Sequence, residues 1–355
     1  MTVKNLLEVF GTWKAEEKPL VVASVFETAG STYSKTGAHM LINGDGEFSG
    51  MLSGGCLEGD LAEHAKIALS SGIPRVVTYD LGDNENELWG LGVGCDGLMH
   101  IFLLPIYVEK GYEPFKAIAD GLGGDKTLVS ITVIESDIDD LPIGTSMVVV
   151  DEKLTFSNVD VQFEKEISEI IGSVAVNQKS QTSDFGVGHE HARLLCSVLK
   201  PPPSILVLGG GLDAAPVVRF AAELGWKVTL QDHRPAYIEA GDFDKAEKIL
   251  CVPVDNLSEA VDLNCYAGAI VMSHHLDNDR KYLHQLSQSC VGYIGLLGPL
   301  ARRQRILQEL GEVGRELETR LHGPAGLDIG GRGPASIALS IIAEMHKNLM
   351  CESDS

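Results

Sequence analysis

Short apolar runs alternate with amphipathic stretches along the whole chain. The segments Leu20 to Phe26, Leu128 to Glu135 and Ser204 to Leu208 are short and almost continuously apolar, so each predicts a buried strand. Before the first of them, Leu6, Val9, Phe10 and Trp13 share one helical face. The pattern therefore predicts helices and sheets together, in a chain built from several mixed layers.

The first strand is followed by a predicted hairpin. His39 to Ile42 and Glu47 to Met51 flank Asn43-Gly44-Asp45-Gly46, whose residues tolerate the positive φ of a tight turn. A helix over 58–69 and strands over 75–80 and 98–104 complete an α+β unit that ends near Pro105. We assign residues 1–110 to this N-terminal domain.

The next segment repeats this pattern. Leu128 to Glu135 parallels Leu20 to Glu27, and Gly144 to Val149 parallels Gly37 to Ile42, at an offset of 107–108 residues. A constant period indicates an internal duplication. Residues 111–199 are thus a degenerate repeat plus linker, and the polar stretch 177–184 is expected to be its most exposed part.

Three consecutive prolines, Pro201 to Pro203, mark a stiff boundary before the last domain, residues 200–350. The strand that follows runs directly into Gly209-Gly210-Gly211-Leu212-Asp213-Ala214, a G-x-G-x-x-A turn. A helix over 215–224 and a strand that ends at Asp232 come next, as in a dinucleotide-binding βαβ unit. Further strands are expected over 248–252, 267–272 and 293–297. The fold class is therefore α/β, with a C-terminal Rossmann-like doubly wound parallel sheet, an N-terminal α+β region and the internal duplication noted above.

Charge and composition narrow the function classes. The net charge is -22 and the pI about 4.8, which disfavours nucleic acid and anionic membranes as partners. No stretch is apolar enough for a membrane span, and an odd number of scattered cysteines fits reduced thiols in the cytoplasm. An anionic ligand must then be held locally, by glycine turns at helix starts or by Arg302, Arg303 and Arg305.

Two cysteines lie in glycine-rich segments, Ser53-Gly54-Gly55-Cys56-Leu57-Glu58 and Gly92-Val93-Gly94-Cys95-Asp96-Gly97. Glycine lets a ligand approach the main chain, and a thiolate is a soft metal ligand, so both segments are candidate binding loops. Either cysteine could instead be a small packing residue in a tight turn. Cys56 and Cys95 are the candidate metal ligands of the chain.

The Rossmann-like domain offers a second set of candidates. Gly209 and Gly211 could bind a phosphate, Asp232 could accept hydrogen bonds from a ribose diol, and His274 and Gly298 would lie at neighbouring strand ends. Some domains of this fold carry the turn without using a dinucleotide. The glycine-rich segment 322–334 is either a binding loop or a stiff connector, with Arg332 as its anion partner.

Taken together, the chain resembles the XdhC/CoxI family of accessory factors for molybdenum hydroxylases. The resemblance rests on motifs that occur in order: Gly37-Ala38-His39-Met40, the two glycine-cysteine segments, the Gly209 turn, Asp232-His233-Arg234-Pro235, Tyr293 to Gly298 and Gly326-Leu327-Asp328-Ile329-Gly330. The chain departs from the family pattern in three places: at Leu212, at Gly333 and at the pair Ala335-Ser336. Leu212 removes a histidine contact, and the others weaken helix capping.

The resemblance implies a factor that binds the molybdenum cofactor, assists its sulfuration by a cysteine desulfurase and delivers it to an apo molybdenum hydroxylase. It implies a chaperone, acting as a homodimer, rather than a catalyst. The expected cofactor contacts are Gly54, Gly55, Cys56, Glu58, Cys95, Gly209, Gly211, Asp232, His274, Gly298, Asp328 and Arg332. The alternatives are an NAD(P)-dependent oxidoreductase and a structural adaptor of the hydroxylase.

Overall fold

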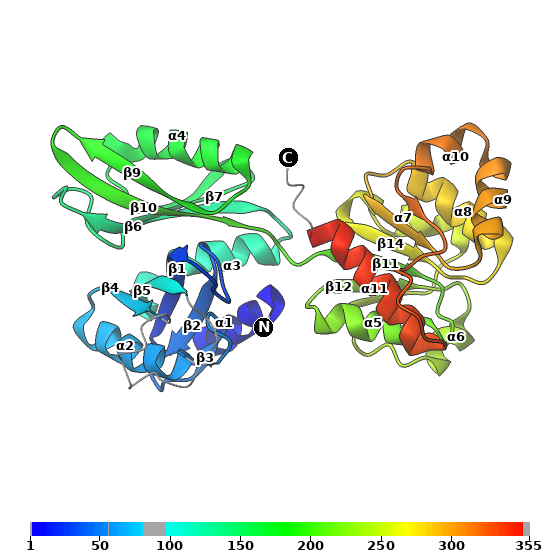
Figure 1. The fold of residues 1–355 in the computed structure, drawn as a ribbon, viewed down its shortest axis with the longest axis horizontal. Helices are drawn as coiled ribbons and strands as arrows, with labels where there is room; N and C mark the ends of the chain where they lie inside the picture. Colours follow the sequence, from blue (N-terminus) through cyan, green and yellow to red (C-terminus); the bar gives the residue numbers. More distant parts are fainter. Residues whose placement is uncertain (1, 56, 81–96, 351–355) are drawn as a thin grey trace. The chain divides into compact units, whose positions relative to one another are not determined.

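The computed structural model describes residues 2–55, 57–80 and 97–350 (Figure 1). The chain divides into two compact units, residues 1–201 and 202–355. The division falls within the three prolines. None of the helices in these described ranges is both long and apolar enough to cross a membrane.

The N-terminal unit begins with a five-stranded antiparallel sheet in the order β3-β2-β1-β5-β4. Its elements are α1 (Val3–Ala15), β1 (Leu20–Ala29), β2 (His39–Asn43), β3 (Phe48–Ser49), α2 (Glu58–Ser71), β4 (Arg75–Asp80) and β5 (Leu98–Ile106). The predicted hairpin and helix are confirmed. Asn43 closes the hairpin, because its side-chain oxygen accepts hydrogen bonds from the backbone N–H groups of Asp45 and Glu47.

A second sheet has the same organisation, in the order β8-β7-β6-β10-β9. Its elements are η1 (Val108–Lys110), α3 (Phe115–Gly123), β6 (Leu128–Ser136), β7 (Ser146–Val150), β8 (Lys153–Ser157), α4 (Val161–Asn177), β9 (Gln181–Val187) and β10 (Glu190–Leu199). The strand order is the one that a duplication predicts. In the polar stretch 177–184, α4 ends at Asn177 and β9 begins at Gln181 and pairs with β10. The residues of this stretch are all exposed or half-buried.

The two halves of this unit pack against each other. One buried cluster consists of Phe26 and Phe102 from the first half and Ile134 and Leu195 from the second. These are equivalent positions, since Ser24 pairs with Phe102 as Thr132 pairs with Leu195. The halves therefore meet through the same face of each sheet and share the buried clusters between them, and each half also has a core of its own.

The C-terminal unit contains a six-stranded parallel sheet in the order β13-β12-β11-β14-β15-β16, as a Rossmann fold requires. Its strands are β11 (Ser204–Leu208), β12 (Lys227–Gln231), β13 (Lys248–Leu250), β14 (Gly268–Val271), β15 (Tyr293–Leu296) and β16 (Leu321–His322). Its helices are α5 (Ala214–Glu223), α6 (Pro235–Ala240), η2 (Val254–Asn256), α7 (Leu257–Ala260), η3 (Leu263–Cys265), α8 (Leu276–Ser287), α9 (Leu300–Leu310), α10 (Glu312–Leu317) and α11 (Pro334–Met350).

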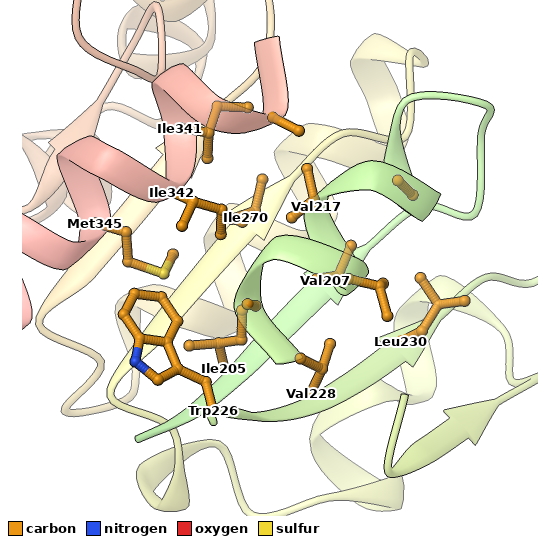
Figure 2. Close-up of a cluster of buried hydrophobic side chains, with 14 of the residues drawn as sticks. Ile205, Val207, Val217, Trp226, Val228, Leu230, Ile270, Ile341, Ile342 and Met345 are labelled. Atoms are coloured by element: carbon orange, nitrogen blue, oxygen red, sulfur yellow. The ribbon is translucent and has the colours of Figure 1, made fainter. Parts of the chain in front are cut away.

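Alternate side chains of the central strands enter two cores. Ile205 and Val207 pack with Val217 of α5 and with Ile341 and Met345 of α11, as Figure 2 shows. Leu206 and Leu208 face the opposite core, which includes side chains of α8 and α9. Strand order reverses between β11 and β14, so the crevice of the sheet opens where these strands end, at Gly209 and Met272.

Candidate functional site

The glycine loop before α2 is organised by Glu58. This side chain is 1% exposed, and its carboxylate accepts hydrogen bonds from the N–H groups of Leu52, Ser53, Gly55 and Leu57 at 2.9, 2.9, 3.0 and 3.2 Å. It also accepts one from the Ser53 hydroxyl at 2.6 Å. Burial raises the Glu58 pKa, but the hydrogen bonds from Ser53 and Leu52 outweigh it, so the pKa is lowered and the group is anionic.

This arrangement gives Glu58 a role that sequence reasoning missed. The carboxylate faces its own loop, where it satisfies backbone donors, rather than open solvent. Gly54 and Gly55 have φ values of +82° and +107°, and a Cβ at Gly55 would meet nothing within 4 Å. The main chain at Gly55 is therefore open to the approach of a ligand. Cys56 and Cys95 themselves lie outside the described residues.

The turn after β11 requires its first glycine. Gly209 has a φ of +120°, and a Cβ there would lie 2.6 Å from the carbonyl oxygen of Met272 at the end of β14. A Cβ at Gly211 would lie 3.5 Å from the His274 ring, and one at Gly298, where φ is +130°, 2.7 Å from Arg302 Cδ. The structure therefore brings Gly209, Gly211, His274 and Gly298 to the same crevice, as the sequence predicts.

A pocket of about 510 Å³ opens beside this turn, between the starts of α5 and α6. Its lining is mostly backbone and small or apolar side chains, with one carboxylate: Gly210, Gly211, Leu212, Ala215, Ala236, Tyr237, Ala240, Gly241 and Asp242. The Leu212 side chain is 87% exposed. The size and lining of the pocket suit a flat heterocycle attached to a phosphate at the turn.

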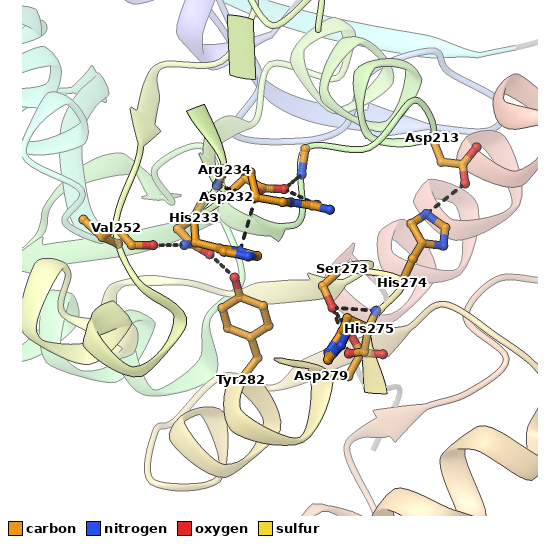
Figure 3. Close-up of polar contacts among 12 residues, drawn as sticks. Asp213, Asp232, His233, Arg234, Val252, Ser273, His274, His275, Asp279 and Tyr282 are labelled. Atoms are coloured by element: carbon orange, nitrogen blue, oxygen red, sulfur yellow. Dashed lines mark hydrogen bonds and ion pairs between the residues drawn. The ribbon is translucent and has the colours of Figure 1, made fainter. Parts of the chain in front are cut away.

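Asp232 is enclosed by its own chain, contrary to the simplest form of the ribose prediction. Its Oδ1 accepts hydrogen bonds from N and Nε of Arg234, both at 2.9 Å, and its Oδ2 from Gly210 N and Arg234 Nη2, both at 2.7 Å (Figure 3). Burial raises the Asp232 pKa, yet the Arg234 and Gly210 bonds lower it overall. A ribose diol at Asp232 would have to displace Arg234.

Arg234, part of a motif in the sequence, was not among the expected cofactor contacts. Its guanidinium lies 3.5 Å from the centre of the Tyr237 ring while it binds Asp232. The Arg234 pKa is raised by this carboxylate. The Tyr237 ring, which lines the pocket, is therefore held in place by the Arg234 guanidinium, and that guanidinium is bound in turn by Asp232. The Asp-x-Arg spacing was visible in sequence, but the direction of the side chains was not.

The opposite side of the crevice carries further polar contacts, of which His274–Asp213 and Ser273–Asp279 are drawn in Figure 3. His274 has a φ of +60°, and its Nε2 lies 3.3 Å from Asp213 Oδ2. Behind it, the buried Asp279 accepts hydrogen bonds from the Ser273 hydroxyl and from Arg302 Nε at 2.9 Å. A non-glycine residue at positive φ in a crevice is typical of a constrained binding position. The sequence predicted His274 but neither aspartate.

The arginine cluster does not form an anion site in this structure. Arg302 binds Asp279, Arg303 donates to the carbonyl oxygens of Glu318 and Leu321, and Arg305 pairs with Glu309. Arg302 and Arg303 hold α9 against neighbouring segments, and Arg305 pairs within α9 on its exposed side. The expectation that they bind an anionic ligand is therefore not supported by their contacts.

The segment 322–334 is held against α11 and β15 by several hydrogen bonds. Glu344 Oε2 accepts hydrogen bonds from the Tyr293 hydroxyl at 2.6 Å and from Gly326 N at 2.8 Å. Beyond it, Asp328 and Arg332 are exposed and form no hydrogen bond or ion pair within the described ranges. In the same ranges, no group of three or more His, Cys, Asp or Glu side chains is placed to hold a metal ion.

Comparison with known proteins extends this description. The model of the XdhC Rossmann domain matches residues 205–345, and that of the XdhC and CoxI family matches residues 13–80. A Bacillus subtilis protein described as a probable xanthine dehydrogenase subunit is 27% identical over 330 residues, which cover 93% of each chain. The molybdenum cofactor insertion chaperone PaoD from Escherichia coli is 22% identical over 92% of this chain and 83% of its own.

A solved structure agrees with the fold. A protein from Bacillus halodurans described as a xanthine dehydrogenase, BH1974, is 28% identical and superposes with a TM-score of 0.79. The match covers 100% of this chain and 97% of that one. The likeness therefore includes both the α+β unit and the Rossmann unit.

Proposed function

Because the chain belongs to the XdhC and CoxI family, we propose that it is an accessory factor that binds the molybdenum cofactor and assists its insertion into a hydroxylase of the xanthine dehydrogenase type. The observation that carries this proposal is the likeness over nine-tenths of the chain to two relatives, one named as a cofactor insertion chaperone and the other as part of a xanthine dehydrogenase. The protein itself would be a carrier, with no catalytic residue of its own.

The described residues fit part of this ligand. Molybdopterin is a flat pterin with a phosphate tail, and the pocket beside Gly210 and Gly211 combines backbone donors with the exposed ring of Tyr237. The phosphate would bind at the turn that starts α5, and the pterin would lie along Tyr237. Cys56 and Cys95 would supply soft donors for the metal or its labile sulfur. The bound group supplies its redox chemistry only in the client enzyme.

Two finer parts of the proposal rest on the family resemblance alone. These are sulfuration by a cysteine desulfurase and assembly as a homodimer. Pull-down of the desulfurase with the purified chain tests the first, and sedimentation equilibrium tests the second. A monomer at micromolar concentration would remove the homodimer without affecting cofactor binding.

The experiment that tests the function has two readouts. The protein is purified from cells that make the cofactor, and bound molybdenum and pterin fluorescence are measured. It is then mixed with apo-hydroxylase, and the recovered hydroxylase activity is compared with that obtained with free cofactor alone. We expect stoichiometric pterin and faster activation. If the protein carries no pterin and does not activate the hydroxylase, the proposal is contradicted. Activation without bound pterin would favour a structural adaptor.

The NAD(P)-dependent oxidoreductase remains the second candidate, because the G-x-G-x-x-A turn and the adjoining pocket also suit a dinucleotide. The engagement of Asp232 by Arg234 argues for weak binding of NAD. Calorimetric titration with NAD and NADP distinguishes the candidates. A dissociation constant below about 10 µM, together with measurable hydride transfer, would favour the oxidoreductase.

A further inference from the structure

Asp232 follows β12, at the position where a dinucleotide-binding Rossmann fold has the acidic residue that binds ribose. The residue is 1% exposed, and a carboxylate offers about four lone-pair sites for hydrogen bonds. Four N–H groups donate to it: Gly210 N and Arg234 Nη2 to Oδ2, both at 2.7 Å, and N and Nε of Arg234 to Oδ1, both at 2.9 Å (Figure 3). These four bonds use the whole acceptor capacity of the carboxylate.

The Arg234 side chain supplies the same kind of contact that a ribose diol would supply. Its Nε and Nη2 are neighbouring donors on one planar group, and each bonds to a different oxygen of Asp232. A ribose diol also presents two neighbouring donors, its 2′ and 3′ hydroxyls. The guanidinium therefore occupies the two acceptor sites that the diol needs.

The local sequence fixes this arginine in its place. Pro235 follows it, and a residue before proline is held in an extended conformation, as the Arg234 φ of −106° and ψ of 106° show. The bond from Arg234 N to Asp232 Oδ1 closes an Asx turn. The guanidinium also lies 3.5 Å from the centre of the Tyr237 ring. Backbone, carboxylate and aromatic ring thus all hold the side chain against Asp232.

The rest of the crevice keeps the features of a dinucleotide site. Gly209 makes the tight turn with a φ of +120°, and a pocket of about 510 Å³ adjoins Gly210 and Gly211. NAD, which this fold implies, therefore fails to fit at one contact rather than throughout the crevice. That contact is the ion pair between Arg234 and Asp232.

We propose that Arg234 is a specificity-determining residue that excludes NAD, because its guanidinium takes the place of the ribose diol at Asp232. The diol offers two neutral donors, whereas the guanidinium brings a full positive charge to a buried carboxylate. Displacing Arg234 therefore costs more than the diol returns. The crevice is left to ligands that do not need Asp232. This proposal rests on the contacts of Asp232 and holds whether or not the protein carries the molybdenum cofactor.

Removing the arginine side chain tests the proposal by a gain of binding. Arg234→Ala frees one acceptor site on each Asp232 oxygen and keeps both backbone donors. Calorimetric titration with NAD should show binding at least about tenfold tighter than in wild type, because the diol can then bind a charged acceptor. The chain has a net charge of -22, so losing a cation should by itself weaken the binding of an anionic ligand. Charge alone therefore cannot produce the expected gain.

Three comparisons show whether the gain acts through Asp232. NADP should gain nothing, because its 2′-phosphate would place a second anion against the carboxylate. Adding Asp232→Asn to Arg234→Ala should abolish the gain for NAD. Arg219→Ala is the charge-matched control, since Arg219 lies 3.9 Å from Asp242 of the same pocket, and it should not tighten NAD binding.

Arg234→Gln is a second variant, which keeps one amide donor for Asp232 should the alanine variant fail to fold. It should show a smaller gain in the same direction. An unchanged affinity for NAD in a folded variant would overturn the proposal. So would an equal gain for NADP, or a gain that persists with Asp232→Asn, because either would mean that the substitution had only widened the pocket.

Discussion

At the scale of single residues, Glu58 shows how one carboxylate can shape a loop. It accepts five hydrogen bonds from the loop that precedes it, so the loop depends on a full negative charge. Glu58→Gln keeps the shape but turns an amide toward backbone donors. We expect a loss of about 2–3 kcal/mol in the free energy of unfolding, measured by urea denaturation.

The matched control for this change is Glu63→Gln, on the exposed side of the same helix, where Glu63 only pairs with Lys66. This control should leave the urea midpoint unchanged. A Glu58→Gln protein as stable as wild type would mean that the loop does not require the anion.

Cys56 is the residue on which the proposed cofactor contact most depends. Cys56→Ser should fold normally yet lose bound molybdenum, because a serine hydroxyl is a hard donor and cannot replace the soft thiolate. Cys251→Ser is the control, since Cys251 is exposed. Cys196 would not serve, because it is buried and a serine there would itself destabilise the sheet. Unchanged loading of apo-hydroxylase by Cys56→Ser would reduce Cys56 to a packing residue.

His39 predicts a pH dependence with a definite sign. Its folded pKa, about 4, is below the ordinary value of 6.5, so the unfolded chain binds the proton more readily. The contribution of neutral His39 to the free energy of unfolding is at its maximum above about pH 6.5 and decreases as the pH approaches 4. The difference in urea midpoint between wild type and His39→Leu should therefore shrink between pH 7 and pH 4.5. A constant difference would contradict it.

At the scale of elements, the segment 322–334 is attached to α11 and β15 through Glu344. Glu344→Gln weakens the bonds to Tyr293 and Gly326, so this segment should open more often. Faster hydrogen exchange at Gly326 measures this. Glu316→Gln, which is exposed on α10, is the control, and equal exchange in both variants would show that Glu344 is not the anchor.

At the scale of the whole molecule, the two units have separate cores, and each contains complete sheets. Residues 202–355 expressed alone should therefore unfold cooperatively, as a Rossmann domain of ordinary size does. Thermal unfolding followed by circular dichroism measures this. A soluble fragment that binds a hydrophobic dye and lacks a cooperative transition would show that the Rossmann unit needs the rest of the chain.

Much of this architecture follows from the sequence alone. Short apolar runs predicted β1, β6 and β11, the Asn43 turn predicted the hairpin, and the glycines after Leu208 predicted the Rossmann turn. These features depend on interactions between residues close in sequence, or on backbone geometry that only glycine or asparagine readily adopts. Strand β9 was missed because it is an edge strand with a single buried side chain, Phe185.

Only the tertiary structure decided what the charged residues do. The sequence determined that Asp232 ends a strand and that Glu58 starts a helix, but not that each carboxylate turns toward donors of its own chain. It likewise placed His39 on a strand without showing that its Nδ1 lies beside the Ser24 hydroxyl. Backbone periodicity sets which face a side chain takes, whereas its partners come from segments brought together by packing.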